Sequence, residues 1–262
     1  MKVVAASRLR RAQERIFGAR PYAREMMALM ESVAAHTPEP YHPLLEQRPV
    51  KKTLLVVVTA DRGLCGAFNA NLIRAAESYV GQHPDLDVSL LALGRKGRDA
   101  FRRRGMNLAG ERVNLFRNLD FSHAQEIARE LTESYTRRSV DAVDVIYNEF
   151  KSILTQRVRI ERFLPIAPLR SQAGELMVDY IYEQPPRELF RALAPRYVEI
   201  EVYRTLLESQ AAEHAARMTA MDAATNNADE LIDSLTLTLN RLRQAAITKE
   251  IIEVVSGADA LR

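Results

Sequence analysis

The chain has 262 residues, of which 47% are hydrophobic and 27% are charged. This composition supplies enough apolar surface for one or two folded domains, and it excludes a disordered or collagen-like chain. The 37 Lys and Arg residues barely outnumber the 34 Asp and Glu residues, too small an excess for a strongly basic nucleic-acid-binding protein. Because Cys65 is the single cysteine, no intramolecular disulfide can form, and a reducing compartment is expected.

The N-terminal segment predicts a long helix. Residues 2 to about 35 contain only Gly18 and Pro21 as helix breakers, so we expect one amphipathic helix with a kink near Pro21. The loop TPEPYHP, residues 37–43, should end it. No secretory signal is expected, and the longest strongly apolar run, residues 54–58, is far shorter than the roughly 18–20 residues that span a bilayer. Direct membrane insertion is therefore not expected.

The middle of the chain predicts an α/β domain. The continuous apolar runs at residues 53–59 and 88–93 are typical of strands that are covered on both faces. Each run leads through a glycine-containing turn into an amphipathic helical stretch. Further strands are predicted at residues 143–150, 157–166 and 177–182, with an antiparallel or edge member among them. These elements indicate a small, Rossmann-like and mostly parallel sheet.

The C-terminal segment predicts a second, very long helix. Residues 196–256 contain neither Gly nor Pro, which predicts a helix of about 90 Å at 1.5 Å per residue. Alternate steps of four and three residues from Leu193 to Lys249 meet an apolar side chain at 13 of 17 positions. This is the pattern of a coiled-coil seam, in which three of the four polar exceptions, Arg204, His214 and Thr225, should fix the register.

The two ends of the chain are expected to pair. An antiparallel coiled coil of the terminal helices would leave the α/β domain inserted between them. The predicted division is residues 1–36 for the N-terminal shaft helix, 37–184 for the α/β foot domain and 185–262 for the C-terminal shaft helix.

Several long motifs resemble one known family. They are MKVVAASRLRRAQ at the N-terminus, ARPYA at residues 19–23, TADRGLCGAFNANL at residues 59–72, and QAAITKEIIEVVSGADAL at residues 244–261. The chain resembles the gamma subunits of F-type ATP synthases over nearly its whole length. In this family the central turn motif corresponds here to Asp61, Arg62, Gly63, Cys65 and Gly66.

The resemblance implies a rotor shaft with no catalytic residues and no cofactor of its own. One such chain stands inside a ring of three alpha and three beta subunits, and its foot binds the epsilon subunit and the membrane ring of c subunits. Ion flow turns the shaft, which drives the beta subunits through ATP synthesis. The expected location is the cytoplasmic face of a bacterial inner membrane, as a peripheral protein.

The resemblance also implies two kinds of contact surface. Directional polar contacts with the catalytic ring are expected at Arg217, Arg243, Gln244, Thr248, Glu250 and Glu253. A low-friction apolar tip is expected at Ile251, Ile252, Val254, Val255 and Leu261, because apolar contacts have no preferred angle. Without the resemblance, Arg243 and Glu250 would be read as ordinary solvated helix charges.

Chains of this family carry a further helical segment before the position of Met1. That segment would pair with the shaft near residues 242–255. We expect a start codon assigned too late; the alternative is a shaft with a single-stranded tip.

Two other functions remain open from the residues alone. A nucleotide-dependent enzyme is suggested by glycines after apolar strands, but residues 63–66 and 94–97 match no phosphate-binding motif, so we expect tight turns there, with Asn69 as an N-cap. A homodimeric coiled-coil scaffold or nucleic-acid-binding protein could use the basic stretch at residues 95–104. Cys65 is expected to be a small buried side chain, and His214 a packed interface residue rather than a metal ligand.

Overall fold

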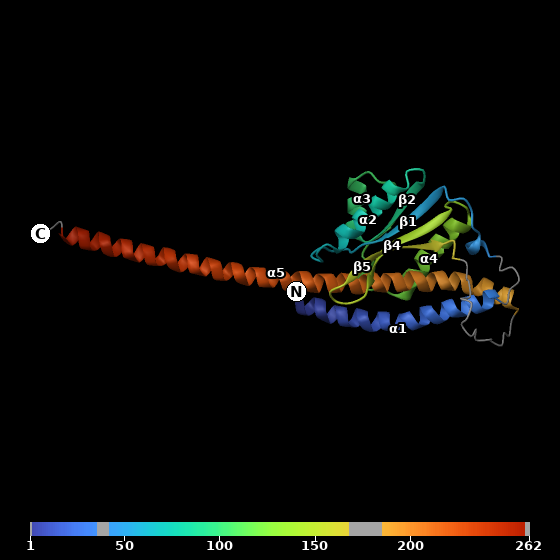
Figure 1. Cartoon of the computed structure of the whole chain (residues 1–262), viewed down its shortest axis with the longest axis horizontal. Coiled ribbons are helices and arrows are strands. Elements are labelled where there is room, and N and C mark those ends of the chain that lie inside the picture. The colour runs from blue at the N-terminus through green and yellow to red at the C-terminus, as the bar shows by residue number, and fades with distance from the viewer. Residues whose placement is uncertain (1, 36–41, 168–184, 260–262) are drawn as a thin grey trace. The chain divides into compact units, whose positions relative to one another are not determined.

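The computed structural model describes residues 2–35, 42–167 and 185–259 (Figure 1). In chain order the elements are α1 (Lys2–Ala35), a short 3₁₀ helix (Pro43–Leu45), β1 (Lys52–Val58), α2 (Phe68–Gln82), β2 (Asp87–Leu93), α3 (Arg95–Arg103), β3 (Leu108–Arg112), a second 3₁₀ helix (Leu115–Arg117), α4 (Phe121–Thr136), β4 (Ala142–Phe150), β5 (Gln156–Leu164) and α5 (Pro186–Asp259). The chain forms two compact units, Met1–Thr219 and Ala220–Arg262. The predicted strand at residues 177–182, and most of the predicted loop at 37–43, lie outside the described residues.

The sheet is mostly parallel, as predicted. Its five strands lie in the order β3-β2-β1-β4-β5; the first four are parallel, and β5 runs antiparallel to β4. Six of the seven residues of the central strand β1 are buried, which explains its unbroken apolar sequence. The edge strand β3 was not predicted, because its sequence LAGER has no run of apolar or β-branched residues.

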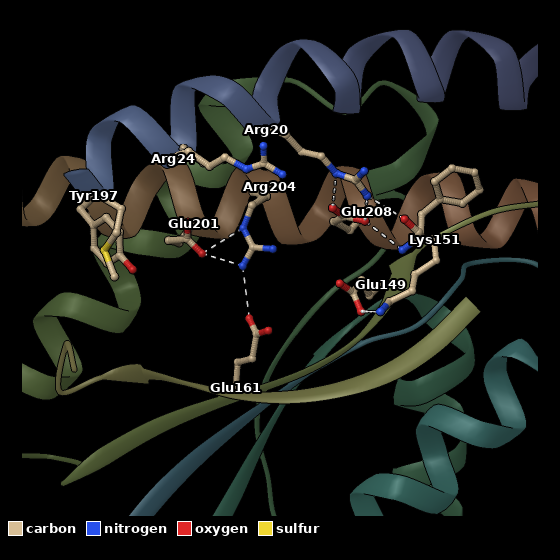
Figure 2. A pocket seen from close by; sticks show the side chains of 12 residues that line it. Arg20, Arg24, Glu149, Lys151, Glu161, Tyr197, Glu201, Arg204 and Glu208 are labelled. Atoms are coloured by element: carbon tan, nitrogen blue, oxygen red, sulfur yellow. Dashed lines mark hydrogen bonds and ion pairs between the residues drawn. The ribbon is translucent and has the colours of Figure 1, made fainter. Parts of the chain in front are cut away.

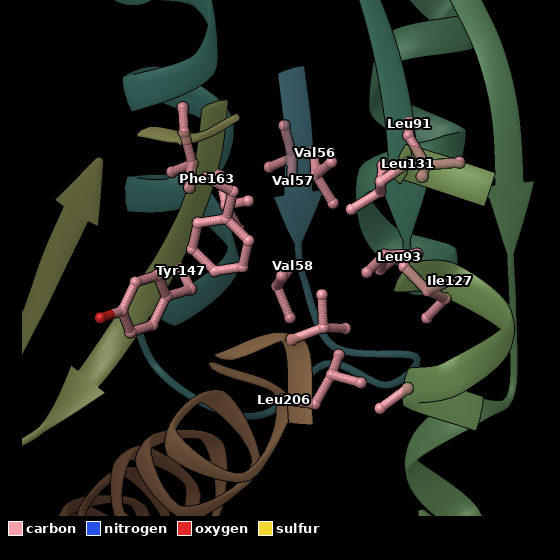
Figure 3. Close-up of a cluster of buried hydrophobic side chains, with 14 of the residues drawn as sticks. Val56, Val57, Val58, Leu91, Leu93, Ile127, Leu131, Tyr147, Phe163 and Leu206 are labelled. Atoms are coloured by element: carbon pink, nitrogen blue, oxygen red, sulfur yellow. The ribbon is translucent and has the colours of Figure 1, made fainter. Parts of the chain in front are cut away.

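Helices cover both faces of the sheet. α2 and α3 pack on one face, where they contact each other and the parallel strands. α4 and the first part of α5 lie on the opposite face, and the ring of Phe121 meets the ring of Tyr203 edge-on at 5.3 Å. Val58 and Leu206 belong to the apolar cluster between the sheet and α5 (Figure 3). The foot and the first part of α5 therefore share one core.

The terminal helices pair in antiparallel orientation, as predicted (Figure 1). α1 continues through Pro21 as a single helix. Its buried apolar residues alternate at steps of four and three through much of the helix, which is the spacing of a coiled-coil seam. They are Ala5, Leu9, Ala12, Ile16, Ala23, Met30 and Val33. Hydrogen bonds from Arg15 to Tyr203 Oη (2.9 Å) and from Arg20 to Glu208 (3.0 Å) join this helix to α5.

One expectation about the seam is wrong. Arg204 was expected to fix the register of the coiled coil, but its guanidinium points to the sheet (Figure 2). It donates to Glu161 of β5 at 3.2 Å, to Tyr147 Oη of β4 at 3.3 Å and to Glu201 of its own helix at 2.7 Å. The sequence pattern could not show this, because α5 packs against two partners and a heptad count assumes one.

Candidate subunit-interaction surfaces

Residues 223–254 of α5 carry an unusual amount of exposed apolar surface. Every side chain described there is exposed except Asn240, which is half-buried. The large apolar side chains among them are about 50–70% exposed: Leu231, Ile232, Leu235, Leu237, Leu239, Leu242, Ile247, Ile251, Ile252 and Val254. So large an apolar surface marks a contact site for another molecule.

The predicted polar contacts lie on this same helical segment, with one exception. Arg243, Gln244, Thr248, Glu250 and Glu253 are all exposed. The Thr248 hydroxyl donates to the Gln244 carbonyl at 2.8 Å, and Glu253 pairs with Lys249 at 3.6 Å. These are contacts within one helix, so they leave the side chains accessible to a partner. Their role in binding remains a prediction.

The predicted apolar tip is described in part. Ile251 and Ile252 are 58% exposed, and Val254 is 71% exposed. The side chain of Val255 and the whole of Leu261 lie outside the described part of the chain. The three described members present apolar atoms on a freely accessible helix.

Arg217, the exception, lies in the first compact unit. Its side chain is 15% exposed and pairs with Glu213 at 2.7 Å. It also donates to the Gly63 carbonyl at 3.3 Å, which ties α5 to the motif turn after β1. Arg217 is therefore already engaged within its own chain, and its contact with a partner stays a prediction.

Two titratable groups beside Arg217 are perturbed. Burial is the main cause that raises the pKa of Glu213, and the Arg217 guanidinium opposes it. Burial, with the nearby charges of Arg217 and Arg8, lowers the pKa of His214 to about 4. His214 is consequently neutral at pH 7, and its half-buried side chain lies between α1 and α5 beside Arg8 and Arg217.

The motif turn is held by neighbouring loops. Asp61 Oδ1 accepts hydrogen bonds from the backbone N–H groups of Arg95 (3.0 Å) and Asn114 (2.8 Å). These groups follow the carboxyl ends of β2 and β3, at the edge where open α/β sheets commonly bind ligands. The Asp61 carboxylate of the chain therefore already occupies both of these backbone donors.

The glycine turns have structural causes, as predicted. Gly94 has φ +104°, and a Cβ atom there would lie 2.1 Å from the carbonyl oxygen of Thr59. Leu64 adopts φ 62° and is 64% exposed, an uncommon pairing of backbone conformation and apolar side chain. Cys65 is buried as predicted, and burial raises the pKa of its thiol.

The expectation that Asn69 caps α2 is wrong. The helix begins at Phe68, after an N-cap at Ala67 that makes no side-chain cap bond. Asn69 lies inside the helix, and its side-chain oxygen accepts from the N–H of Ala60 at 2.9 Å. The side chain thus closes the motif turn, a long-range use that local capping rules do not anticipate.

Sequence analysis also missed a basic groove. It has a volume of ≈ 740 Å³ and lies between α1, α5, the motif turn and residues 114–119. Its arginines come from four separate segments: Arg8, Arg11, Arg15, Arg62, Arg117 and Arg217. The basic stretch at residues 95–104 is instead partly neutralised, since Arg102 pairs with Glu111 at 2.7 Å and Arg104 pairs with Glu77.

Within the described ranges, no cluster of three or more His, Cys, Asp or Glu side chains is arranged to hold a metal ion. None of the helices described combines the length and the apolar character needed to cross a bilayer.

Known proteins resemble this chain over most of its length. A family model described as ATP synthase matches residues 1–261. The chain is 50% identical to the ATP synthase gamma chain of Solibacter usitatus, with 99% of this chain and 91% of that relative aligned. It is 47% identical to the ATP synthase gamma chain of Chloroherpeton thalassium, with 100% of this chain and 91% of that relative aligned.

Solved structures give the same picture. A chain from the central stalk and c-ring of the Tetrahymena thermophila mitochondrial ATP synthase has a TM-score of 0.67 and 28% identity, covering 86% of this chain and 97% of that one. A chain from the Euglena gracilis mitochondrial ATP synthase has a TM-score of 0.61 and covers 98% of this chain and 95% of that one. Because the two chains are only 17% identical, this likeness supports the fold alone.

Proposed function

Because the chain belongs to the ATP synthase gamma-chain family, it is a non-catalytic central-stalk subunit of an ATP synthase, and we propose how its surfaces serve that role. The observation that carries the proposal is the exposed apolar surface of residues 223–254. This segment is the part of the shaft that stands inside the ring of alpha and beta subunits. Residues 1–36 and 185–262 form the shaft, and residues 37–184 form the foot.

The foot faces the membrane sector, where it binds the epsilon subunit and the ring of c subunits. Support comes from the similar Tetrahymena chain, whose structure is described as central stalk and c-ring. One gamma chain serves each complex, because a single shaft fills the axis of one ring. The bacterial relatives support a place on the cytoplasmic face of a bacterial inner membrane, as a peripheral subunit held there through the complex.

The shaft makes different contacts with the three chemically identical beta subunits. A single asymmetric helix cannot make the same contacts with three beta subunits, so it favours a different nucleotide-binding state in each. Ion flow turns the foot, and the turning shaft moves each beta subunit through these states. ATP hydrolysis drives the same cycle in reverse.

The apolar and the polar side chains of residues 223–254 have different roles in this cycle. Ile251, Ile252 and Val254 supply contacts without a preferred angle, which allow rotation. Arg243 and Gln244 supply directional hydrogen bonds that form in some orientations only. Thr248, Glu250 and Glu253 extend this polar set along the helix, and Arg217 acts nearer to the foot.

The first test is assembly. The chain, co-expressed with alpha and beta subunits, should co-purify at one copy per three alpha–beta pairs. Crosslinks between α1 and α5 should form within one chain. A homodimer with crosslinks between chains would instead support the scaffold alternative.

The second test separates coupling from assembly. We expect Arg243→Ala with Gln244→Ala to lower ATP synthesis per assembled complex about fivefold, since it removes directional hydrogen bonds of which one is charged. The amount of complex should stay near the wild-type level. Arg241→Ala removes the same charge from another exposed position of this helix and serves as the matched control. Equal losses of synthesis and assembly would indicate a structural role only.

A further inference from the structure

Three elements meet at Arg20, the arginine of the ARPYA motif, in an arrangement that the functional surfaces above do not explain. Arg20 lies on α1, its partner Glu208 lies on α5, and Phe150 is the last residue of β4. The Arg20 Nε donates to Glu208 Oε1 at 3.0 Å, and its Nη2 donates to Glu208 Oε2 at 3.1 Å. This fork-to-fork geometry is the strong, directional form of an ion pair. Figure 2 shows both side chains converging from the two helices.

The backbone of the sheet closes the junction. The N–H of Phe150 donates to Glu208 Oε2 at 2.8 Å, and the carbonyl of Phe150 accepts from Arg20 Nη2 at 2.7 Å. The side chain of Glu208 is 3% exposed and that of Arg20 is 28% exposed. Four hydrogen bonds thus join both helices and the sheet at one largely buried place.

A second contact lies one helical turn away on α5. Arg204, four residues before Glu208, donates to Glu161 of β5 and to Tyr147 of β4. Both contacts border the same groove of ≈ 680 Å³ between α1, α5 and the β4–β5 hairpin. The contacts of Glu208 and Arg204 lie at different positions along α5, so together they resist rotation of the helix against the sheet. A single contact would act as a pivot.

The apolar contacts between α5 and the sheet cannot supply this resistance, and the other directional bonds, from Ser209 to the Val58 carbonyl at 3.4 Å and from Arg217 to the Gly63 carbonyl at 3.3 Å, are longer. Leu206 packs in an apolar cluster against Val58 (Figure 3). Apolar burial is non-directional, so it opposes separation of the surfaces more than small sliding between them. Any slip that withdraws Arg20 from Glu208 leaves a buried carboxylate without its partner, which is strongly unfavourable.

We propose that the Arg20–Glu208 ion pair, closed through the backbone of Phe150, is a rotational lock that transmits torque between the sheet domain and the helix pair. The inference rests on the proposed rotor function and assigns positioning residues to it. Arg20 and Glu208 act by fixing the angle at which the foot holds the shaft.

The test uses the complete complex, with its catalytic ring fixed to a surface and a rod attached to the c-ring. The angular spread of the rod during pauses reports how far the shaft twists against the foot. We expect Glu208→Gln to widen this spread about twofold, because a charge-assisted hydrogen bond is roughly twice as strong as a neutral one. Arg20→Lys keeps the charge but loses the fork, and should widen the spread less. Arg10→Met removes an exposed ion pair of the same helix and should leave the spread unchanged.

Three outcomes are decisive. An unchanged spread in assembled Glu208→Gln and Arg20→Lys complexes would overturn the lock, even if both variants lowered the yield of complex. If Glu208→Gln fails to assemble, Arg20→Lys decides alone. If the wild-type chain forms no turning complex, the proposed rotor function fails, a result separate from an unchanged spread in working complexes.

Discussion

The two parts of α5 share one spacing of apolar residues and have opposite surroundings. In residues 186–219, which we call the covered segment, Val202, Leu206 and Leu207 are at most 4% exposed. In residues 220–259, the uncovered segment, Leu235 and Leu239 are 59% and 65% exposed. Both segments follow the same heptad pattern. The pattern therefore shows that a helix needs a partner, but not whether the partner belongs to the same chain.

The polar residues of the two segments differ in the same way. Glu208 and Glu213 of the covered segment are buried and hold arginine partners. Glu250 of the uncovered segment is exposed. Buried charges need partners and so fix a single arrangement, whereas exposed charges stay available for binding. The charges of the covered segment are thus held by partners within the chain, whereas those of the uncovered segment are exposed.

Removal of a core side chain from the covered segment should have the largest effect on stability. Leu206 is 1% exposed and lies in the apolar cluster of the sheet face (Figure 3). Leu206→Ala should lower the free energy of unfolding by about 3 kcal/mol, because it removes buried methyl groups and leaves a cavity. Chemical unfolding of the isolated chain followed by circular dichroism measures this loss. A change below about 0.5 kcal/mol, the usual size for a surface substitution, would show that the segment is not packed as described.

His214, near the end of the covered segment, should make stability depend on pH. Burial, with the Arg217 and Arg8 charges, lowers its pKa from 6.5 to about 4 in the folded chain. As the pH falls from 6.5 towards 4.5, the unfolded chain binds a proton at this site and the folded chain does not. The free energy of unfolding should therefore fall by about 2 kcal/mol over this window.

The comparison variant for this effect is His214→Gln. Glu213 has a raised pKa, so it contributes a pH dependence of opposite sign in an overlapping range. The difference between the wild-type and His214→Gln curves isolates the histidine. Parallel curves between pH 7 and 4.5 would contradict the assignment of a buried, neutral His214.

Much of the fold could be predicted, because the strongest signals are local. The apolar runs of β1, β2 and β4 and the region without Gly or Pro in α5 match the observed elements closely. β3 could not be predicted, since an edge strand needs few apolar residues. The seam of α1 was only partly anticipated, because Ala5, Ala12 and Ala23 are small and their burial depends on a close neighbouring helix.

The contacts inside the site were harder to predict than the surfaces. The heptad pattern identified Leu235, Leu239 and Leu242 of the uncovered segment as seam residues, but it did not predict that they are exposed in this chain. Arg204 and Arg217 could not be assigned to their partners, which lie 43 and 154 residues away in the chain. Which partner a long side chain contacts depends on the tertiary fold, and no periodicity in the sequence predicts it.

A substitution in the uncovered segment should have the smallest effect on the isolated chain. Leu235 is 59% exposed, so Leu235→Ala removes little buried surface and should change the free energy of unfolding by less than about 0.5 kcal/mol. The same unfolding measurement, repeated over a range of protein concentrations, should give concentration-independent values for both chains. If Leu235→Ala instead lowered the free energy of unfolding about as much as Leu206→Ala, and more at higher protein concentration, a second copy of the chain would cover Leu235. That result would contradict the difference between the covered and uncovered segments. A small, constant effect would show that Leu235 gains no burial in the isolated chain, as expected of a segment that we propose stands inside the catalytic ring.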